Sequence, residues 1–333
     1  MPRKKRIVTI TGATGFVGRA LVARLLQEKD IQVRCMLRPG NDTSALSELS
    51  DKLTFCEGDI TDPTTLQDAF EDSWGVVNLA GYREFWARDR DQFYAINQRG
   101  AENVFKTCLA AGVNKVVQVS TPLAYGVPEK LPFRENSPPG PHPSDYGRSK
   151  YLGDTAGWAL HRESGLPLTI VYLAAVIGAG DDKATMEVRR AMEKRLPALV
   201  GADTTYTYVY LRDAAEAIAR ALLAEDSVGR RYLVGDQRAT TREYFNMIGE
   251  LADVPIPSAN IPERWLVPPA RLLEWVSRRT GQRPAIPLDV IKTTAAGSLP
   301  FSAARSKREL KMRYTPLRDA LAESVAEIRG TGG

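Results

Sequence analysis

Two residues that can act together in acid–base chemistry stand four positions apart: Tyr146 and Lys150, in the run Tyr-Gly-Arg-Ser-Lys. Residues at this spacing share one face of a helix. A lysine ammonium beside a phenol favours the tyrosinate and lowers the pKa of the phenol from about 10 toward neutrality. Such a phenol can give a proton to a carbonyl oxygen. Because the pattern is short, an ordinary exposed Tyr/Lys pair is the alternative interpretation.

Hydroxyl side chains form a second candidate group, Ser120 and Thr121, at the end of an apolar run over 116–120. We expect this run to be a parallel strand, and the carboxyl ends of parallel strands face the crevice where ligands bind. A hydroxyl there can hydrogen-bond the same carbonyl oxygen as Tyr146. The alternative is a turn formed by Ser-Thr-Pro.

A glycine-rich bend is the third candidate. Three glycines spaced three apart follow an apolar run over 7–10 and precede a helical pattern. Glycine permits positive φ and lets a ligand approach the backbone, and the first N–H groups of a helix attract a pyrophosphate. The spacing G-x-x-G-x-x-G differs from the commonest dinucleotide fingerprint, so a glycine turn without a ligand is the alternative. The bend predicts a dinucleotide site made by Gly12, Thr14, Gly15, Phe16, Val17 and Gly18.

The elements that must position these groups alternate along the chain. Apolar runs typical of strands lie over 7–10, 33–37, 53–56, 76–81, 116–120 and 168–173, with helical patterns over 95–111 and 144–163. This rhythm predicts an α/β, doubly wound parallel-sheet Rossmann fold. Further on we expect helices over 184–195 and 212–224 and strands over 206–211 and 231–234.

The pattern changes after Gly178 and becomes mostly helical and interrupted by prolines from Thr240 onward. We therefore expect a smaller, mostly helical C-terminal substrate lobe over the open end of the sheet. The predicted division assigns 1–178, completed by about 203–236, to an NADP-binding Rossmann domain. It assigns 179–202 and 237–330 to a substrate-binding lobe.

Composition narrows the class of protein. The chain has 333 residues, 43% hydrophobic and 26% charged, with a net charge of +5. The basic run over 3–6 indicates a solubilising start rather than nucleic-acid binding. We find no signal peptide and no apolar run of membrane-spanning length, and the three cysteines are far apart, as in reduced thiols of a cytoplasmic protein. Two histidines and no cysteine pair make a zinc site improbable.

Taken together, the motifs resemble the extended branch of the short-chain dehydrogenases/reductases over nearly the whole chain. Within it, the run over 302–317 looks like dihydroflavonol reductases and 3β-hydroxysteroid dehydrogenases. Motifs that carry the resemblance, besides those above, are Gly58-Asp59-Ile60-Thr61-Asp62, Asn78-Leu79-Ala80-Gly81, Asn97, Tyr125-Gly126 and the run from Tyr208 to Ala217.

The resemblance implies roles for particular residues. Tyr146 would be the catalytic acid/base, Lys150 would lower its pKa and hold the nicotinamide ribose, and Thr121 would supply the catalytic hydroxyl, with Ser120 as the fallback. Asn97 would support the site by hydrogen bonding within its helix. The implied cofactor contacts further along the chain are Asp59 and Ile60 at the adenine, Ala80 and Gly81, and Val176.

Arg38 bears on the choice of cofactor, since it lies at the end of the second expected strand, where NAD-binding folds carry an acidic residue. An arginine there favours the 2′-phosphate of NADP, and Arg34 on the same strand face is a candidate assistant. A solvated loop arginine is the alternative. We expect NADP in preference to NAD.

The expected activity is reduction of a ketone to a secondary alcohol, or the reverse. A sugar epimerase or dehydratase that retains its nicotinamide, and a dinucleotide-binding protein without turnover, are the rivals. Ala174-Ala175 stands where nucleotide-sugar enzymes of the family carry Asn, and Tyr172-Leu173 departs from the family's Arg-Pro.

Two aromatic stretches have open roles. The run over 82–86 is either a wall for a bulky apolar ketone or a capping loop. The run over 265–276 either touches a membrane surface or packs on its own core. We expect a small-molecule, apolar carbonyl or alcohol as substrate, and a homodimer is possible through the helices that bear Asn97 and Tyr146.

Overall fold

The structure is a computed structural model that describes residues 5–180, 182–193 and 195–331. Positions 3 and 4 of the basic run, and positions 181 and 194 of the expected lobe, lie outside the described residues. Within the described ranges, no helix is both long enough and apolar enough to cross a membrane.

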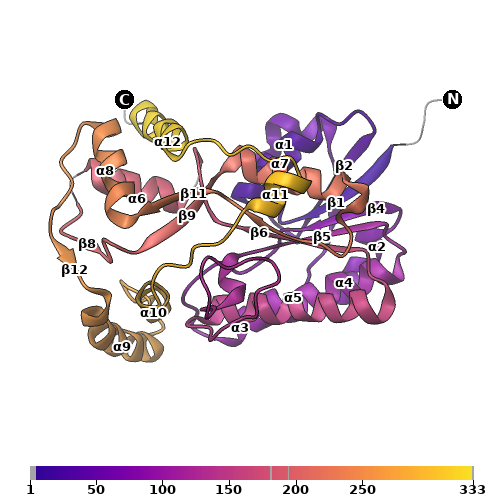
Figure 1. The fold of residues 1–333 in the computed structure, drawn as a ribbon. Coiled ribbons are helices and arrows are strands. Elements are labelled where there is room, and N and C mark those ends of the chain that lie inside the picture. The colour runs from indigo at the N-terminus through magenta and orange to yellow at the C-terminus, as the bar shows by residue number, and fades with distance from the viewer. Residues whose placement is uncertain (1–4, 181, 194, 332–333) are drawn as a thin grey trace.

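A seven-stranded parallel sheet forms the centre of the molecule (Figure 1), in the order β10-β6-β5-β4-β1-β2-β3. The order reverses between β1 and β4, where open α/β sheets bind their ligands. The predicted doubly wound Rossmann fold is confirmed. In chain order the strands are β1 (Arg6–Thr11), β2 (Ile31–Leu37), β3 (Thr54–Glu57), β4 (Ser73–Asn78), β5 (Lys115–Ser120), β6 (Leu168–Leu173) and β10 (Arg231–Val234).

Helices cover both faces of this sheet, so its central strands are buried on both sides, and every residue of β5 and β6 is buried. One face carries α1 (Phe16–Leu25) and α7 (Leu211–Leu223), which pack on each other, with α11 (Ala304–Glu309) beside them. The other face carries α2 (Leu66–Phe70), α3 (Asp91–Tyr94), α4 (Ala101–Ala110) and α5 (Asp145–Ser164). Short 3₁₀ segments lie over Ser44–Lys52, Pro63–Thr65, Pro122–Tyr125 and Glu225–Ser227.

A second, smaller unit lies to the left in Figure 1 and has its own apolar core. Its three-stranded sheet has the order β11-β9-β7, and the rings of Tyr208 and Tyr244 stack with centroids 5.0 Å apart in that core. Its elements are β7 (Ala175–Ile177), α6 (Asp182–Met192), β9 (Thr205–Tyr210), β11 (Gln237–Thr240), α8 (Thr241–Ala252) and α12 (Leu317–Thr331).

The outer edge of this unit holds the paired strands β8 (Leu199–Val200) and β12 (Asn260–Ile261) and the helices α9 (Glu263–Thr280) and α10 (Leu288–Ala295). The expected strand over 206–211 corresponds to β9, which belongs to the smaller sheet and not to the large one. The chain after α10 returns to the large sheet, because Ser306 of α11 donates a hydrogen bond of 2.8 Å to the carbonyl of Leu233 in β10.

Candidate active site

The glycine bend between β1 and α1 is closed to side chains. Gly12 has φ +69°, and a Cβ there would lie 2.9 Å from the amide nitrogen of Ala80. A Cβ on Gly18 would lie 2.2 Å from the carbonyl oxygen of Gly12. The Gly15 amide closes the bend by donating to that same oxygen over 3.1 Å. Only glycine at positions 12 and 18 therefore allows the turn to bring the start of α1 against the end of β4.

The bend fits the diphosphate of a dinucleotide. The helix α1 begins at Phe16 without a side-chain cap at Gly15 and without an acidic residue in its first turn. Its first N–H groups and its positive dipole end are therefore available to an anion. Thr14 is half-buried beside them, and its hydroxyl accepts a hydrogen bond of 3.4 Å from the Asn41 amide in the loop after β2.

The loops after β2 and β3 bring the predicted adenosine contacts to the same edge of the sheet. Arg38 is exposed one residue beyond β2. The Asp59 carboxylate accepts from the backbone and the hydroxyl of Thr61, both at 2.8 Å, and Ile60 is buried. Arg34 does not assist Arg38, because its guanidinium donates to the carbonyls of Ala69 and Glu71 on the far side of β2.

The end of β4 approaches the candidate catalytic lysine. Thr11 donates to the side chain of Asn78 over 2.6 Å and accepts from the Ala80 amide over 3.0 Å, which fixes the turn after β4. A Cβ on Gly81 would lie 3.8 Å from Nζ of Lys150. Ala80 and Gly81 thus stand between the glycine bend and Lys150, as a cofactor spanning both requires.

The helix α5 and the end of β5 bring the three candidate catalytic residues together. The helix begins after Ser144, whose side chain caps it by accepting from the Gly147 amide over 3.2 Å. The first turn then places Tyr146 beside Thr121, close enough for the Thr121 hydroxyl to lower the pKa of the phenol. One turn later the ammonium of Lys150 donates to the carbonyl of Val119 over 2.8 Å.

The electrostatics of Tyr146 differ from the expectation that Lys150 lowers its pKa. Burial raises the pKa of the phenol to about 12, partly offset by the charge of Arg83 and the hydrogen bond with Thr121. Burial also lowers the pKa of Lys150, whose ammonium is directed at the Val119 carbonyl. The expectation from i,i+4 spacing was wrong for this structure, because a shared helix face does not make the two groups contact each other.

Ser120, the fallback hydroxyl, is engaged elsewhere. It donates over 2.6 Å to Asp154, a carboxyl on α5 that is buried beneath Lys150. Burial raises the pKa of Asp154 to about 6, against the lowering effects of Lys150 and of the Ser120 hydrogen bond. The sequence analysis missed Asp154, although it follows Lys150 by four residues and so repeats the Tyr146–Lys150 spacing.

Asn97 supports the site across the fold and not within its helix as expected. It lies in a π-helical turn, Ala95–Gly100, of the kind often found at functional sites. Its side-chain amide donates a hydrogen bond of 2.9 Å to the Tyr82 carbonyl and accepts one of 2.8 Å from the Tyr82 backbone amide. It also donates 3.0 Å to Ser149 of α5. Asn97 therefore ties the loop after β4 to the helix that carries Tyr146 and Lys150.

The aromatic loop over 82–86 lies against the candidate acid. The ring of Phe85 contacts the ring of Tyr146 edge-on, with centroids 5.6 Å apart. The Tyr82 hydroxyl donates 3.1 Å to the Trp86 carbonyl and holds the loop closed. Phe85 therefore places an aromatic ring beside the phenol. Val176, another predicted cofactor contact, lies in β7, where it is half-exposed and pairs with Val209 of β9.

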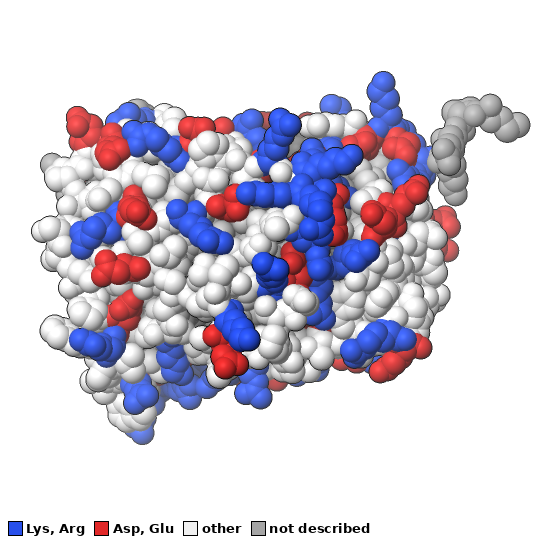
Figure 2. Space-filling model, viewed as in Figure 1, with Lys and Arg blue, Asp and Glu red and all other residues white. Residues whose placement is uncertain are grey.

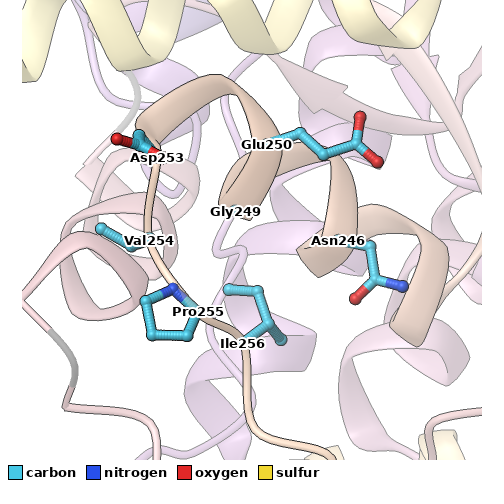
Figure 3. Close-up of a pocket in the computed structure, with 7 residues that line it drawn as sticks. All are labelled: Asn246, Gly249, Glu250, Asp253, Val254, Pro255 and Ile256. Atoms are coloured by element: carbon cyan, nitrogen blue, oxygen red, sulfur yellow. The ribbon is translucent and has the colours of Figure 1, made fainter.

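A hollow of about 390 Å³ lies apart from these groups, at the carboxyl end of α8 (Figure 3). Asn246, Glu250 and Asp253 line it together with Val254, Pro255 and Ile256. None of the predicted site residues lines this hollow. The candidate active site is therefore the group of residues at the carboxyl ends of the strands of the large sheet, and not this hollow.

Known proteins match this chain along its length. The sequence profile of the NAD dependent epimerase/dehydratase family matches residues 8–235. Sterol demethylase protein B of Methylococcus capsulatus is 30% identical over 332 residues, which cover 97% of this chain and 98% of that protein. A 3beta-hydroxysteroid-dehydrogenase/decarboxylase, isoform 1, of Arabidopsis thaliana is 24% identical over 300 residues, 83% of this chain and 68% of that protein.

Among solved structures, the crystal structure of gox2253 superimposes with a TM-score of 0.83 at 30% identity, covering 98% of this chain and 99% of that one. A Rossmann fold with a glycine bend after β1 and a Tyr/Lys pair on α5 is typical of nucleotide-dependent enzymes of the short-chain dehydrogenase/reductase class. This chain belongs to the NAD dependent epimerase/dehydratase family. The resemblance to extended short-chain dehydrogenases/reductases is thereby confirmed.

Proposed function

We propose that this chain is an NADP(H)-dependent oxidoreductase that reduces a ketone to a secondary alcohol, or catalyses the reverse reaction. The observation that carries the proposal is the meeting of Thr121 and Tyr146 at the end of β5, with Lys150 one helical turn away. An acid, a second hydroxyl beside it and a cation held one helical turn away suit a carbonyl oxygen that must gain a proton.

In this proposal Tyr146 gives its proton to the carbonyl oxygen during reduction. The phenol, whose pKa burial raises to about 12, is protonated at neutral pH and so has a proton to give. Thr121 donates a hydrogen bond to the same oxygen, because the hydroxyl of Ser120 is already given to Asp154. The ammonium of Lys150 holds the ribose hydroxyls, and a bound nicotinamide supplies or takes up the hydride.

Cofactor binding is assigned to residues 1–178 and 203–236 and substrate binding chiefly to 179–202 and 237–330. The glycine bend, with Gly12, Gly15, Gly18 and the amides of Phe16 and Val17, receives the diphosphate. The exposed Arg38 takes the 2′-phosphate, which favours NADP over NAD. The remaining contacts in the proposal are Thr14, Asp59 and Ile60 on the adenosine side and Ala80, Gly81 and Val176 on the nicotinamide side.

The proposed substrate is a bulky, apolar carbonyl or alcohol. Phe85 offers its ring beside Tyr146, and the described part of the loop presents no acidic group to the phenol apart from Glu84, which pairs with Arg283 at 3.0 Å. Two relatives are known as a sterol demethylase protein and a hydroxysteroid dehydrogenase/decarboxylase, and these similarities support a polycyclic alcohol or ketone.

The cofactor assignment is tested by titrating NADPH and NADH into the wild type and Arg38→Gln, followed by nicotinamide fluorescence. Charged hydrogen bonds to a phosphate contribute about 1.5–3 kcal/mol, so the variant should bind NADPH roughly 10- to 100-fold more weakly and NADH unchanged. Lys52→Gln, an exposed cation on the neighbouring 3₁₀ segment, is the control and should change neither affinity. Equal loss of both nucleotides in Arg38→Gln would contradict the assignment to NADP.

The reaction is tested by following NADPH absorbance with a panel of cyclic and steroidal ketones. Net consumption of NADPH with formation of the alcohol supports the proposal. Turnover of a sugar nucleotide without net NADPH consumption would support the rival epimerase or dehydratase. Tight NADPH binding without oxidation by any ketone or sugar nucleotide would support a dinucleotide-binding protein.

A further inference from the structure

The helix α9 exposes large apolar side chains along one face. Trp265 is 67% exposed, Leu272 63% and Trp275 53%, and Leu273 and Val276 are exposed as well. Residues 265, 272 and 276 follow one another at helical spacing, so they lie on one side of α9. The segment over 265–276 therefore does not bury its large apolar side chains against its own core, which was one of the two interpretations of the sequence.

Arginines line one flank of this apolar face. Arg264, Arg271 and Arg278 recur every seven residues and are exposed. Arg279 lies over the ring of Trp275, with its guanidinium carbon 4.1 Å from the ring centroid. In Figure 2, basic side chains stand within uncharged surface at the lower left, where Figure 1 places α9.

Among the described residues of α9, those that pack on the protein lie on a third side of the helix, away from the apolar face and the arginines. The buried residues of the helix are the small Ala270 and Ser277, and Glu274 is half-buried. This side contacts α10. The helix therefore has a narrow packed stripe, an arginine flank and an apolar face on which Trp265 and Leu272 stay exposed, while Arg279 lies over the ring of Trp275.

Two contacts join the α9–α10 segment to residues next to the candidate active site. Arg283, just after α9, pairs with Glu84 at 3.0 Å, and Glu84 neighbours Phe85 on the phenol of Tyr146. At α10, Asp289 accepts a hydrogen bond of 2.9 Å from the Asp145 amide, next to Tyr146. These two contacts tie the segment that carries the apolar face to residues next to Phe85 and Tyr146.

We propose that α9 docks this protein onto the surface of a bilayer that contains anionic lipids. Tryptophan and leucine on one face with arginines beside them are typical of helices that lie in the plane of the membrane interface. The arginines would meet lipid phosphates and the apolar side chains would enter the acyl boundary. An apolar substrate would then pass from the bilayer to the crevice, but the docking itself does not depend on the proposed reaction.

The test is flotation of the full chain with vesicles of phosphatidylcholine alone or with about one-third phosphatidylglycerol, at low and at physiological salt. We expect flotation with the anionic vesicles and little with the neutral ones, and a blue shift of tryptophan fluorescence on binding. Each arginine contributes roughly fivefold in affinity at an anionic surface. The variant Arg264→Gln/Arg271→Gln/Arg278→Gln should therefore bind roughly 100-fold more weakly.

The apolar contribution is tested with Trp265→Ser/Leu272→Ser, which should lose flotation while keeping NADPH affinity. The matched control is Leu131→Ser/Met186→Ser, two exposed apolar residues outside α9, and it should float like the wild type. Failure of the wild type to float, equal binding to both vesicles, or unchanged flotation of Trp265→Ser/Leu272→Ser would overturn the proposal. So would a dimer in sedimentation that Trp265→Ser/Leu272→Ser dissociates, because α9 would then be a protein interface.

Discussion

The two ends of the crevice are built in different ways. The cofactor end depends on backbone approach within a short stretch, since a Cβ on Gly18 would meet the carbonyl of Gly12 at 2.2 Å. The substrate end depends on side chains from distant parts of the chain, such as Arg283 with Glu84 and Asp289 with the Asp145 amide.

This difference determines which substitutions each end of the crevice tolerates. A backbone turn that admits no side chain has no substitute, because any added Cβ strikes a main-chain atom. A half-exposed ion pair contributes little to stability and can be replaced. Affinity for the cofactor should therefore respond sharply to single changes at the first end, and substrate preference should respond gradually to changes at the second. Four substitutions test whether the two ends respond in these different ways.

Tyr146→Phe, at the junction of the two ends, should have the largest effect. Removing a general acid lowers turnover roughly 10²–10⁴-fold, and NADPH affinity should stay within about twofold because the ring is retained. Steady-state rates and NADPH titrations measure the two quantities. Tyr151→Phe, one turn further along α5, is the control and should keep full turnover. Parallel loss of turnover and NADPH affinity would mean that Tyr146 holds the cofactor and is not the acid.

Gly18→Ala should follow, with its effect confined to the cofactor end. Overpacking against a backbone oxygen costs about 3 kcal/mol, which corresponds to roughly 100-fold weaker NADPH binding if the turn opens. Isothermal titration gives the affinity, and circular dichroism checks the fold. Gly330→Ala is matched, because a Cβ there meets nothing within 4 Å. Normal NADPH affinity in Gly18→Ala would show that the bend does not hold the diphosphate.

Asp154→Asn tests the buried carboxyl beneath Lys150 through the pH dependence of the free energy of unfolding. The folded-state pKa of Asp154 is about 6, above its ordinary value of 3.8, so the folded protein binds this proton more tightly than the unfolded chain. The free energy of unfolding should thus fall between about pH 4 and 6 by an amount on the order of 2 kcal/mol and then level off.

The variant should lack this component, so the difference in unfolding free energy between wild type and Asp154→Asn should change over that pH window in urea titrations. Asp68→Asn, which removes an exposed carboxylate, is the control and should follow the wild type. A constant difference between wild type and Asp154→Asn from pH 4 to 7 would contradict a buried, proton-binding Asp154.

Arg283→Gln should have the smallest effect and be confined to the substrate end. A half-exposed pair contributes at most about 1 kcal/mol, so the KM for a ketone should rise no more than roughly fivefold, with NADPH affinity unchanged. Glu84→Gln should give the same shift, and the double variant should add nothing to either single change. Independent, additive effects would show that the pair does not act as one unit on the substrate loop.

Local signals in the sequence predicted much of the fold and part of the site. The strands over 116–120 and 168–173 and the helix over 144–163 agree with β5, β6 and α5 within a residue or so, because buried parallel strands and a capped helix have strong local patterns. The glycine bend and the Tyr146–Lys150 spacing were also visible locally. The direction of the phenol pKa was not, because burial comes from segments that pack on Tyr146 from elsewhere.

The order of strands and helices, the glycine turn and the residue types near the end of β5 can be read from local patterns, since each depends on neighbours along the chain. Long-range packing, in contrast, directs the Ser120 hydroxyl to Asp154, joins Asn97 to the Tyr82 loop and leaves the tryptophans of α9 outside the core. These outcomes depend on which distant surfaces come together, and burial or hydrogen bonding between such surfaces leaves no mark on the spacing of residues along one segment.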